Sequence, residues 1–298
     1  MLFAATPVVA FAERGSHAVG GFFKFLGVIK GQTREIDAEA MDVYESTSRS
    51  GSCAERRERL LAILPDALRF SRYARDIAHA DHGSEMKAAG VKTLDLGDGR
   101  SAYSDGAGQR YAEARVDPER HQAVVIFRGT RLSSGSDIST DVLSFIGLQT
   151  GYYAWASSLV AQVVREHPGM AVVVTGESLG GGLTLYAVLH NPGVSGFAFN
   201  PAGLSLLTWA TTRSSERART NAAVTVISTR SADHIEPVTA ISLAGRSVLP
   251  GHIFVVETGA FDALTLHSAK TVVAALEHTA STDAEGSVCD GDLGVLAN

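Results

Sequence analysis

The chain has 298 residues, of which 45% are hydrophobic and 19% are charged. A chain of this length and composition buries a sizeable core, which excludes a mainly disordered protein. Its formal net charge of -6 at pH 7 offers no basic surface to the phosphates of nucleic acid, so nucleic acid is not an expected partner.

The first 56 residues are predicted to form an apolar arm and a linker. Residues 1–12 carry no charge and end in Ala-Phe-Ala, which has the form of a signal-peptide cleavage site, but the basic segment of a signal peptide is missing. Residues 20–30 are apolar with two lysines, a pattern that fits either a membrane-surface segment or an arm packed on the body. Neither stretch has the roughly 20 apolar residues of a membrane span. A secreted or membrane-peripheral location is therefore favoured over a cytoplasmic one.

The body of the protein is predicted to span residues 57–280. Residues 56–82 follow a helical pattern, and from residue 122 onward short β-branched runs alternate with helical patterns. The predicted strands are residues 123–127, 171–175, 195–199, 224–228 and 253–257. Strands that alternate with helices form βαβ units, so the expected fold is α/β, with a mostly parallel central sheet flanked by helices. Residues 281–298, rich in Asp, Glu, Gly and Ser, are predicted to be a flexible acidic tail.

Metal and cofactor sites have no motif in the sequence. The chain contains no H-E-x-x-H and, with Cys53 and Cys289 as its two cysteines, no C-x-x-C. No metal and no cofactor are therefore expected. The cysteines leave two interpretations open, a disulfide that joins the flanks or two exposed thiols.

The most informative motif is Gly-Glu-Ser-Leu-Gly at residues 176–180, directly after a predicted buried strand and before a predicted helix at 179–190. This context is typical of a nucleophile elbow, in which a strained backbone pushes the hydroxyl of the central residue, here Ser178, out of the turn. Gly176 and Gly180 are expected to be glycines because a Cβ at either position would collide with the neighbouring strand and helix.

A serine nucleophile needs a histidine base and a carboxylate, which in sheets of this kind follow the serine in the chain. Chain order excludes the five histidines that precede Ser178, namely His17, His79, His82, His121 and His167. His190 lies roughly 18 Å along the predicted helix, His252 at the amino end of a strand, and His278 at the end of the last helix. His267, in a loop after the last predicted strand, is left as the candidate base.

Three carboxylates are candidates for the acid. Asp233 ranks first because it follows the predicted strand 224–228 within a short loop, at the carboxyl edge of the sheet. Glu236 ranks second, and Asp262, which shares its loop with His267, ranks third.

The oxyanion that develops in acyl transfer needs backbone N–H donors, one after the nucleophile and one from an earlier strand-end loop. Leu179 supplies the first. Thr130 follows the predicted strand 123–127 and Gly129, and is the expected second donor.

Four segments, in this order, resemble the lipase class 3 family of α/β-hydrolases. They are residues 124–130 (VVIFRGT), residues 137–141 (DISTD), Gly151-Tyr152 at the head of a helix, and residues 173–182 (VVTGESLGGG). The resemblance covers roughly residues 57–280. It implies an α/β-hydrolase-type sheet that carries an N-terminal extension.

The resemblance also implies roles for single residues. Ser178 would be the nucleophile, Thr130 and Leu179 the oxyanion hole, and Asp141 a residue that steadies Thr130. The family's Asp-x-Val-Pro-like acid segment is matched loosely by residues 233–237, and its His-Ser pair is matched by residues 267–268. Two positions depart from the family: Glu177 stands where histidine is usual, and Ile138 where tryptophan is frequent.

These observations predict a serine carboxylic-ester hydrolase of lipase or esterase type, which cleaves acyl-ester lipids through an acyl-serine intermediate. Residues 204–221 have an apolar beginning and a basic end, which fits either a mobile cover that faces lipid head groups or a crossover helix packed on the sheet. Two alternatives remain, a phospholipase A that acts on membranes as an effector or toxin, and a non-catalytic binding protein of the same fold.

Overall fold

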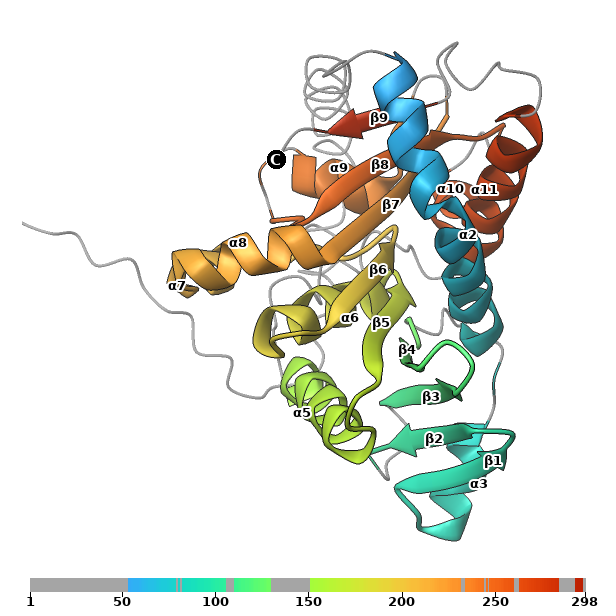
Figure 1. Cartoon of the computed structure of the whole chain (residues 1–298), viewed down its shortest axis with the longest axis vertical. Helices are drawn as coiled ribbons and strands as arrows, with labels where there is room; N and C mark the ends of the chain where they lie inside the picture. Colours follow the sequence, from blue (N-terminus) through green and yellow to red (C-terminus); the bar gives the residue numbers. More distant parts are fainter. Residues whose placement is uncertain are drawn as a thin grey trace, which may run out of the picture. The chain divides into compact units, whose positions relative to one another are not determined.

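In the part of the chain that the structure describes, a nine-stranded sheet forms the centre of the fold (Figure 1). The computed structural model describes residues 53–78, 80, 82–105, 110–129, 151–231, 234–243, 245, 247–259, 263–283 and 293–296. The strands are β1 (Thr93–Gly97), β2 (Arg100–Ser104), β3 (Tyr111–Asp117), β4 (Gln122–Phe127), β5 (Ala171–Glu177), β6 (Ser195–Phe199), β7 (Val224–Arg230), β8 (His252–Glu257) and β9 (Leu293–Leu296). They lie side by side in chain order.

The middle of the sheet is parallel and its two ends are antiparallel. Strands β4 to β8 pair in parallel with one another. Strands β1, β2 and β3 add an antiparallel meander at one end, and β9 pairs antiparallel with β8 at the other. The expected α/β fold with a parallel central sheet is therefore confirmed, and all five predicted strands are present.

Helices cover both faces of the sheet. They are α2 (Cys53–Ala78), α3 (His82–Ala89), α5 (Gly151–Glu166), α6 (Leu179–His190), α7 (Leu206–Thr211), α8 (Ser214–Ala223), α9 (Pro237–Leu243), α10 (Ala263–His267) and α11 (Ala269–Asp283). Alternate residues of β4 face opposite sides: Val125 and Phe127 pack in the core with α5 and α6, whereas Val124 and Ile126 pack with α2 and α11. Because both faces are buried, the central strands read as continuous apolar runs.

The C-terminal stretch differs from the flexible tail expected for residues 281–298. Helix α11 extends to Asp283, and Leu293–Leu296 form β9 on the free edge of β8. The four residues Leu-Gly-Val-Leu supply backbone hydrogen-bond partners for that edge. This strand was not predicted from the sequence because the residues around it are acidic and polar. Helix α2 likewise begins at Cys53, inside the predicted linker. The outer domain boundaries stay predictions, since residues 1–52 lie outside the described part of the chain.

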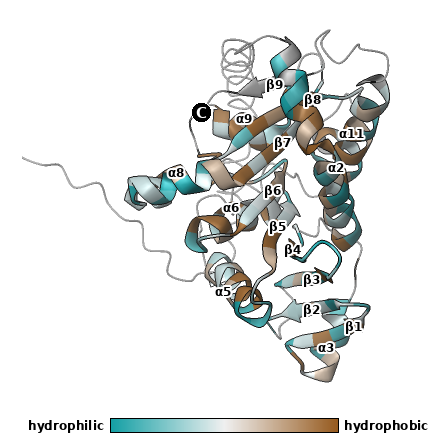
Figure 2. Cartoon of the chain, in the orientation of Figure 1, coloured by the Kyte–Doolittle hydropathy of each residue, from teal (hydrophilic) through white to brown (hydrophobic). Residues whose placement is uncertain are grey.

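The segment after β6, residues 204–221, forms the crossover between the parallel strands β6 and β7, and the mobile cover stays a prediction. It comprises two short helices that project from the sheet, of which α8 is mostly hydrophilic in Figure 2. Helix α7 has no buried residue, and α8 buries Thr220. Leu206 and Leu207 are 52% and 74% exposed. Among the described helices, none is long and apolar enough to cross a membrane.

Candidate active site

Ser178 occupies the turn between β5 and α6 in a strained backbone conformation. Its φ of 58° and ψ of -123° lie outside the regions favoured by residues with a side chain. The surrounding backbone stabilises this conformation: the Ser178 N–H donates to the carbonyl of Phe199, and the Ser178 carbonyl accepts from the N–H groups of Gly182 and Ala202, each at 3.0 Å. The predicted strand, turn and helix of a nucleophile elbow are therefore all present.

The two glycines of the motif are required by close backbone contacts. A Cβ on Gly176 would lie 2.5 Å from the backbone of Gly180 and 2.8 Å from the carbonyl oxygen of Phe127 on β4. A Cβ on Gly180 would collide with the same Phe127 oxygen. The expected collisions with the neighbouring strand and helix are confirmed. Because glycines avoid them, α6 can begin directly after Ser178.

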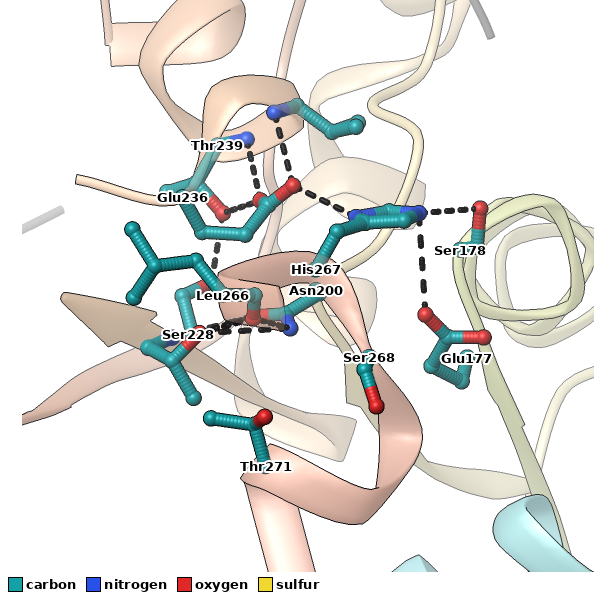
Figure 3. Close-up of polar contacts among 12 residues, drawn as sticks. Glu177, Ser178, Asn200, Ser228, Glu236, Thr239, Leu266, His267, Ser268 and Thr271 are labelled. Atoms are coloured by element: carbon teal, nitrogen blue, oxygen red, sulfur yellow. Dashed lines mark hydrogen bonds and ion pairs between the residues drawn. The ribbon is translucent and has the colours of Figure 1, made fainter. Parts of the chain in front are cut away.

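His267 lies at the end of α10, where its imidazole reaches Ser178 (Figure 3). Its Nε2 is 2.8 Å from the Ser178 Oγ, and both residues are buried. The two are 89 positions apart in the chain, and they meet because β5 and β8 end at the same edge of the sheet. The parallel direction of β5 and β8 thus places the candidate nucleophile and the candidate base side by side, as predicted from chain order and strand direction.

The carboxylate that contacts His267 is that of Glu236, the second-ranked candidate. Its Oε1 lies 2.5 Å from Nδ1 of His267, and the residue is fully buried. Because a carboxylate can only accept, Nδ1 carries the proton of the neutral imidazole and Nε2 is free to accept from the Ser178 hydroxyl. Asp233, which the sequence ranked first, and Asp262 both lie outside the described residues.

Glu236 also caps the short helix α9. Its carboxylate accepts hydrogen bonds from the N–H groups of Val238 at 2.9 Å and Thr239 at 2.8 Å. The Thr239 hydroxyl lies 2.8 Å from Oε2 of Glu236 and 2.7 Å from the Ser228 hydroxyl. Since Glu236 has no proton to give, the Thr239 hydroxyl donates to it and accepts from Ser228. These bonds fix the carboxylate before any substrate arrives.

A signal for Glu236 is present in the sequence. Pro237, at the first position of α9, has no N–H and a fixed φ, and proline is favoured at that place in a helix. The residue before such a proline is the helix cap, which is where an oxygen-bearing side chain is held most firmly. Ranking the acids by distance from the strand end favoured Asp233 instead.

Asn200 and Thr229 hold the end of α10, which carries His267, and sequence reasoning missed both. The Asn200 amide nitrogen donates to the Leu266 carbonyl at 3.1 Å, and the Thr229 hydroxyl donates to the same carbonyl at 2.6 Å. Asn200 Oδ1 accepts from the Thr229 N–H at 3.0 Å, so the two residues are fixed together. Asn200 has a φ of 41° directly after β6, and a polar residue at such a strand end is the signal that could have identified it.

A second carboxylate, that of Glu177, lies on the other side of the imidazole. Its Oε1 is 3.6 Å from Nε2 of His267 (Figure 3). Burial raises the pKa of Glu177 to about 7, against the opposing effect of His267. Burial alone would lower the pKa of His267, but the charges of Glu236 and Glu177 outweigh it and raise that pKa to about 9.

The expected oxyanion hole is described only in part. The Leu179 N–H opens α6 directly after the serine, where the positive end of the helix dipole favours a negative charge. Thr130 and Asp141 lie outside the described residues. Gly129, which precedes Thr130, lies against the elbow: a Cβ there would be 2.9 Å from the carbonyl oxygen of Glu177.

Within the described ranges, no group of three or more His, Cys, Asp or Glu side chains is placed to hold a metal ion. The acids and the histidine of the site are instead engaged with one another, with Ser178 and with backbone N–H groups.

Several solved structures are similar to the chain at low identity. A triacylglyceride lipase from Rhizomucor miehei is 13% identical over 64% of this chain and 79% of its own, with a TM-score of 0.43. Lipase II from Rhizopus niveus is 16% identical over 70% of this chain and 83% of its own, with a TM-score of 0.41. A triacylglycerol lipase from Penicillium expansum is 14% identical over 66% of this chain and 80% of its own, with a TM-score of 0.38. Likeness at this level does not bear on activity.

Comparison by sequence gives the family. No curated protein matches the chain. The model of the phospholipase-like family "Tle-like phospholipase domain" matches residues 80–285, which is more than half of the chain and includes Ser178, Glu236 and His267. The resemblance to lipases that the motifs indicated is confirmed at this level, and the chain belongs to the Tle-like phospholipase domain family of lipase-like and phospholipase-like hydrolases.

Proposed function

We propose that the protein hydrolyses carboxylic esters of acyl lipids, with Ser178 as the nucleophile, His267 as the general base and Glu236 as the acid. The observation that carries this proposal is the unbroken series of contacts from the Ser178 hydroxyl through both imidazole nitrogens to the Glu236 carboxylate. Each group in the series has the partner that its role requires.

The reaction follows from this arrangement. The Ser178 oxygen attacks the ester carbonyl while its proton moves to Nε2 of His267, and Glu236 stabilises the imidazolium that forms. The oxyanion receives the Leu179 N–H and, by the expectation from sequence, the N–H of Thr130. The imidazolium then protonates the leaving alcohol, which leaves an acyl-serine. Water, deprotonated by the same imidazole, attacks the acyl-serine and releases the carboxylic acid and the free enzyme.

The experiment is turnover of a nitrophenyl ester by the wild type, Ser178→Ala and the matched control Ser158→Ala, which alters an exposed serine of α5. We expect Ser178→Ala to lose turnover while its circular dichroism is unchanged, and Ser158→Ala to retain it. A fluorophosphonate probe should label Ser178, as located by peptide mass spectrometry. Undiminished turnover by Ser178→Ala would refute the assignment.

A phospholipase A that acts on bilayers is the second candidate, and the exposed leucines of α7 favour it. Leu206 and Leu207 are followed by the basic residues Arg213 and Arg217, and the Arg213 side chain is 83% exposed. An apolar surface beside arginines fits a layer of acyl chains beneath phosphate head groups. Hydrolysis of phospholipid vesicles should then exceed hydrolysis of tributyrin emulsions at equal ester concentration. The reverse order favours a triacylglycerol lipase.

A non-catalytic binding protein of this fold is disfavoured because Ser178, His267 and Glu236 are hydrogen-bonded in series. The same assays test that alternative. A wild-type protein that neither turns over any ester nor reacts with the probe would be a binding protein.

A further inference from the structure

Glu177 is a buried acid of the site that has no role in the ester hydrolysis as proposed above. It is the last residue of β5, and its side chain is only 14% exposed. Its Oε1 lies 3.6 Å from Nε2 of His267, the nitrogen that also contacts the Ser178 Oγ at 2.8 Å. Nε2 therefore has two possible acceptors once it is protonated, a neutral hydroxyl and a carboxylate.

Gly129, two residues after β4, lies close to the Glu177 carboxylate. A Cβ on Gly129 would lie 3.3 Å from Oε2 of Glu177 and 3.5 Å from the Cβ of Ser178. A side chain at position 129 would therefore contact the Glu177 carboxylate, which the glycine avoids.

The charged groups to consider beside Glu177 are His267, Glu236 and Arg128. His267 faces Glu177 from α10, and Glu236, at the start of α9, faces both. Arg128, which directly follows β4, has its guanidinium 4.7 Å from the centre of the Tyr111 ring. The imidazolium therefore lies between two carboxylates, one on each nitrogen, and the charge interaction of each acid with His267 favours the protonated imidazole.

We propose that Glu177 is a positioning residue that pairs with the Nε2–H of protonated His267 and sets the lower pH limit of catalysis. The inference rests on the proposed function of Ser178 and His267 and adds a third partner to that site. In the resting enzyme between about pH 7 and pH 9, where Glu177 is ionised and His267 is protonated, the pair leaves no lone pair on Nε2 to accept the Ser178 proton. During acylation, the same carboxylate stabilises the imidazolium after the serine proton has moved to Nε2. Glu177 itself neither gains nor loses a proton in that step.

The variant Glu177→Gln tests the charge while it keeps the shape of the side chain. An opposite charge at about 4–6 Å shifts a pKa by roughly 1–3 units. The acid limb of kcat/KM should therefore move at least about one unit to lower pH, and the ratio of variant to wild-type activity should rise as pH falls from about 9 to about 7, the range in which Glu177 is ionised and His267 is protonated. Glu177→Asp keeps the charge on a shorter side chain and should restore most of the wild-type profile. The control Glu277→Gln removes one partner of the surface ion pair with Arg72 and should leave the profile unchanged.

Titration of His267 by nuclear magnetic resonance separates this inference from the proposed function. In a Ser178→Ala background, Glu177→Gln should lower the pKa of the His267 imidazole nitrogens, whether or not the protein turns over esters. A shift in this titration without wild-type turnover supports the Glu177 pair and refutes the hydrolase proposal alone. An unchanged titration overturns the inference, as does an activity loss in Glu177→Gln that is equal at every pH.

Discussion

The carboxylate of Glu236 and the imidazole of His267 are joined at 2.5 Å across 31 positions of the chain. The same carboxylate accepts the first free N–H groups of α9, so a single side chain anchors a helix and orients the candidate base. The position of the Glu236 carboxylate is therefore fixed by the backbone N–H groups of α9 as well as by His267.

Replacing Glu236 with Gln should lower kcat by about three to four orders of magnitude, because an amide cannot stabilise the imidazolium and favours the wrong tautomer. The matched variant Asp233→Asn should keep kcat within about twofold. Ester turnover measured at saturating substrate distinguishes them. If Asp233→Asn shows the larger loss, the acid is Asp233.

Asn200→Asp should reduce kcat by roughly tenfold or more through displacement of His267. The carboxylate still accepts from the Thr229 N–H but cannot donate, so the bond to the Leu266 carbonyl at the end of α10 is lost together with the longer bond to the Thr229 hydroxyl. Asn200→Ala loses both contacts and should also lower the free energy of unfolding by about 1–3 kcal/mol. Urea unfolding and kcat are measured on both variants. Equal kcat for Asn200→Asp and the wild type would contradict the positioning role.

Gly180→Ala should destabilise the fold by at least about 1–3 kcal/mol, because the added methyl group collides with the Phe127 carbonyl under the elbow. Gly259→Ala is the control, since a Cβ there meets nothing within 4 Å. Thermal unfolding of the two purified variants compares them. A Gly180→Ala protein as stable as the wild type would show that the elbow relaxes without cost.

Ionisation of Glu177 should make the fold less stable as pH rises. Its pKa is raised to about 7 in the folded protein against an ordinary value near 4.5, so the folded state binds more protons than the unfolded state between these values. Below pH 6.5, where the His267 imidazole is protonated in both states, Glu177→Gln removes this loss. Its stability relative to the wild type should increase by about 1–3 kcal/mol from pH 4.5 to 6.5. Denaturant unfolding at the two pH values measures it, and a constant difference would contradict the raised pKa.

Replacing both Leu206 and Leu207 with Ser should weaken hydrolysis of phospholipid vesicles by roughly tenfold or more, because each leucine loses the free energy of burial in the acyl layer. Turnover of a soluble nitrophenyl ester should stay within about twofold. Val164→Ser, which changes a 37% exposed apolar residue of α5, is the control. An equal loss on both substrates would indicate damage to the site rather than a lipid contact.

The sequence predicted the parallel strands because a strand buried on both faces appears as a continuous run of apolar, β-branched residues. It predicted Ser178 and His267 as partners because strand direction fixes the edge of the sheet at which the segment after each strand lies. It did not predict the antiparallel strands β1, β2, β3 and β9, and the partly exposed residues of β1 and β2 lack a clear apolar pattern. A signal was nevertheless there: Asp98 and Gly99, both with positive φ, form the two-residue turn between them.

The carboxylate that contacts His267 was harder to predict than the imidazole itself. Asp233 and Glu236 share one loop, and a difference of three residues in a loop cannot be decided from strand periodicity. The choice depends on a helix cap and on hydrogen bonds from Thr239 and Ser228, which are tertiary contacts. Asn200 and Thr229 could not be predicted for the same reason, since their partner is the backbone of Leu266 in a distant segment.

The pairing of β9 with β8 has a practical consequence for anyone who shortens or extends the protein at its C-terminus. Removing Leu293–Leu296 would uncover the backbone N–H and carbonyl groups of Ile253 to Val256, a ready template for the strand of a second molecule. The result to anticipate from such a truncation is self-association and precipitation, arising next to the strand that leads to the candidate base.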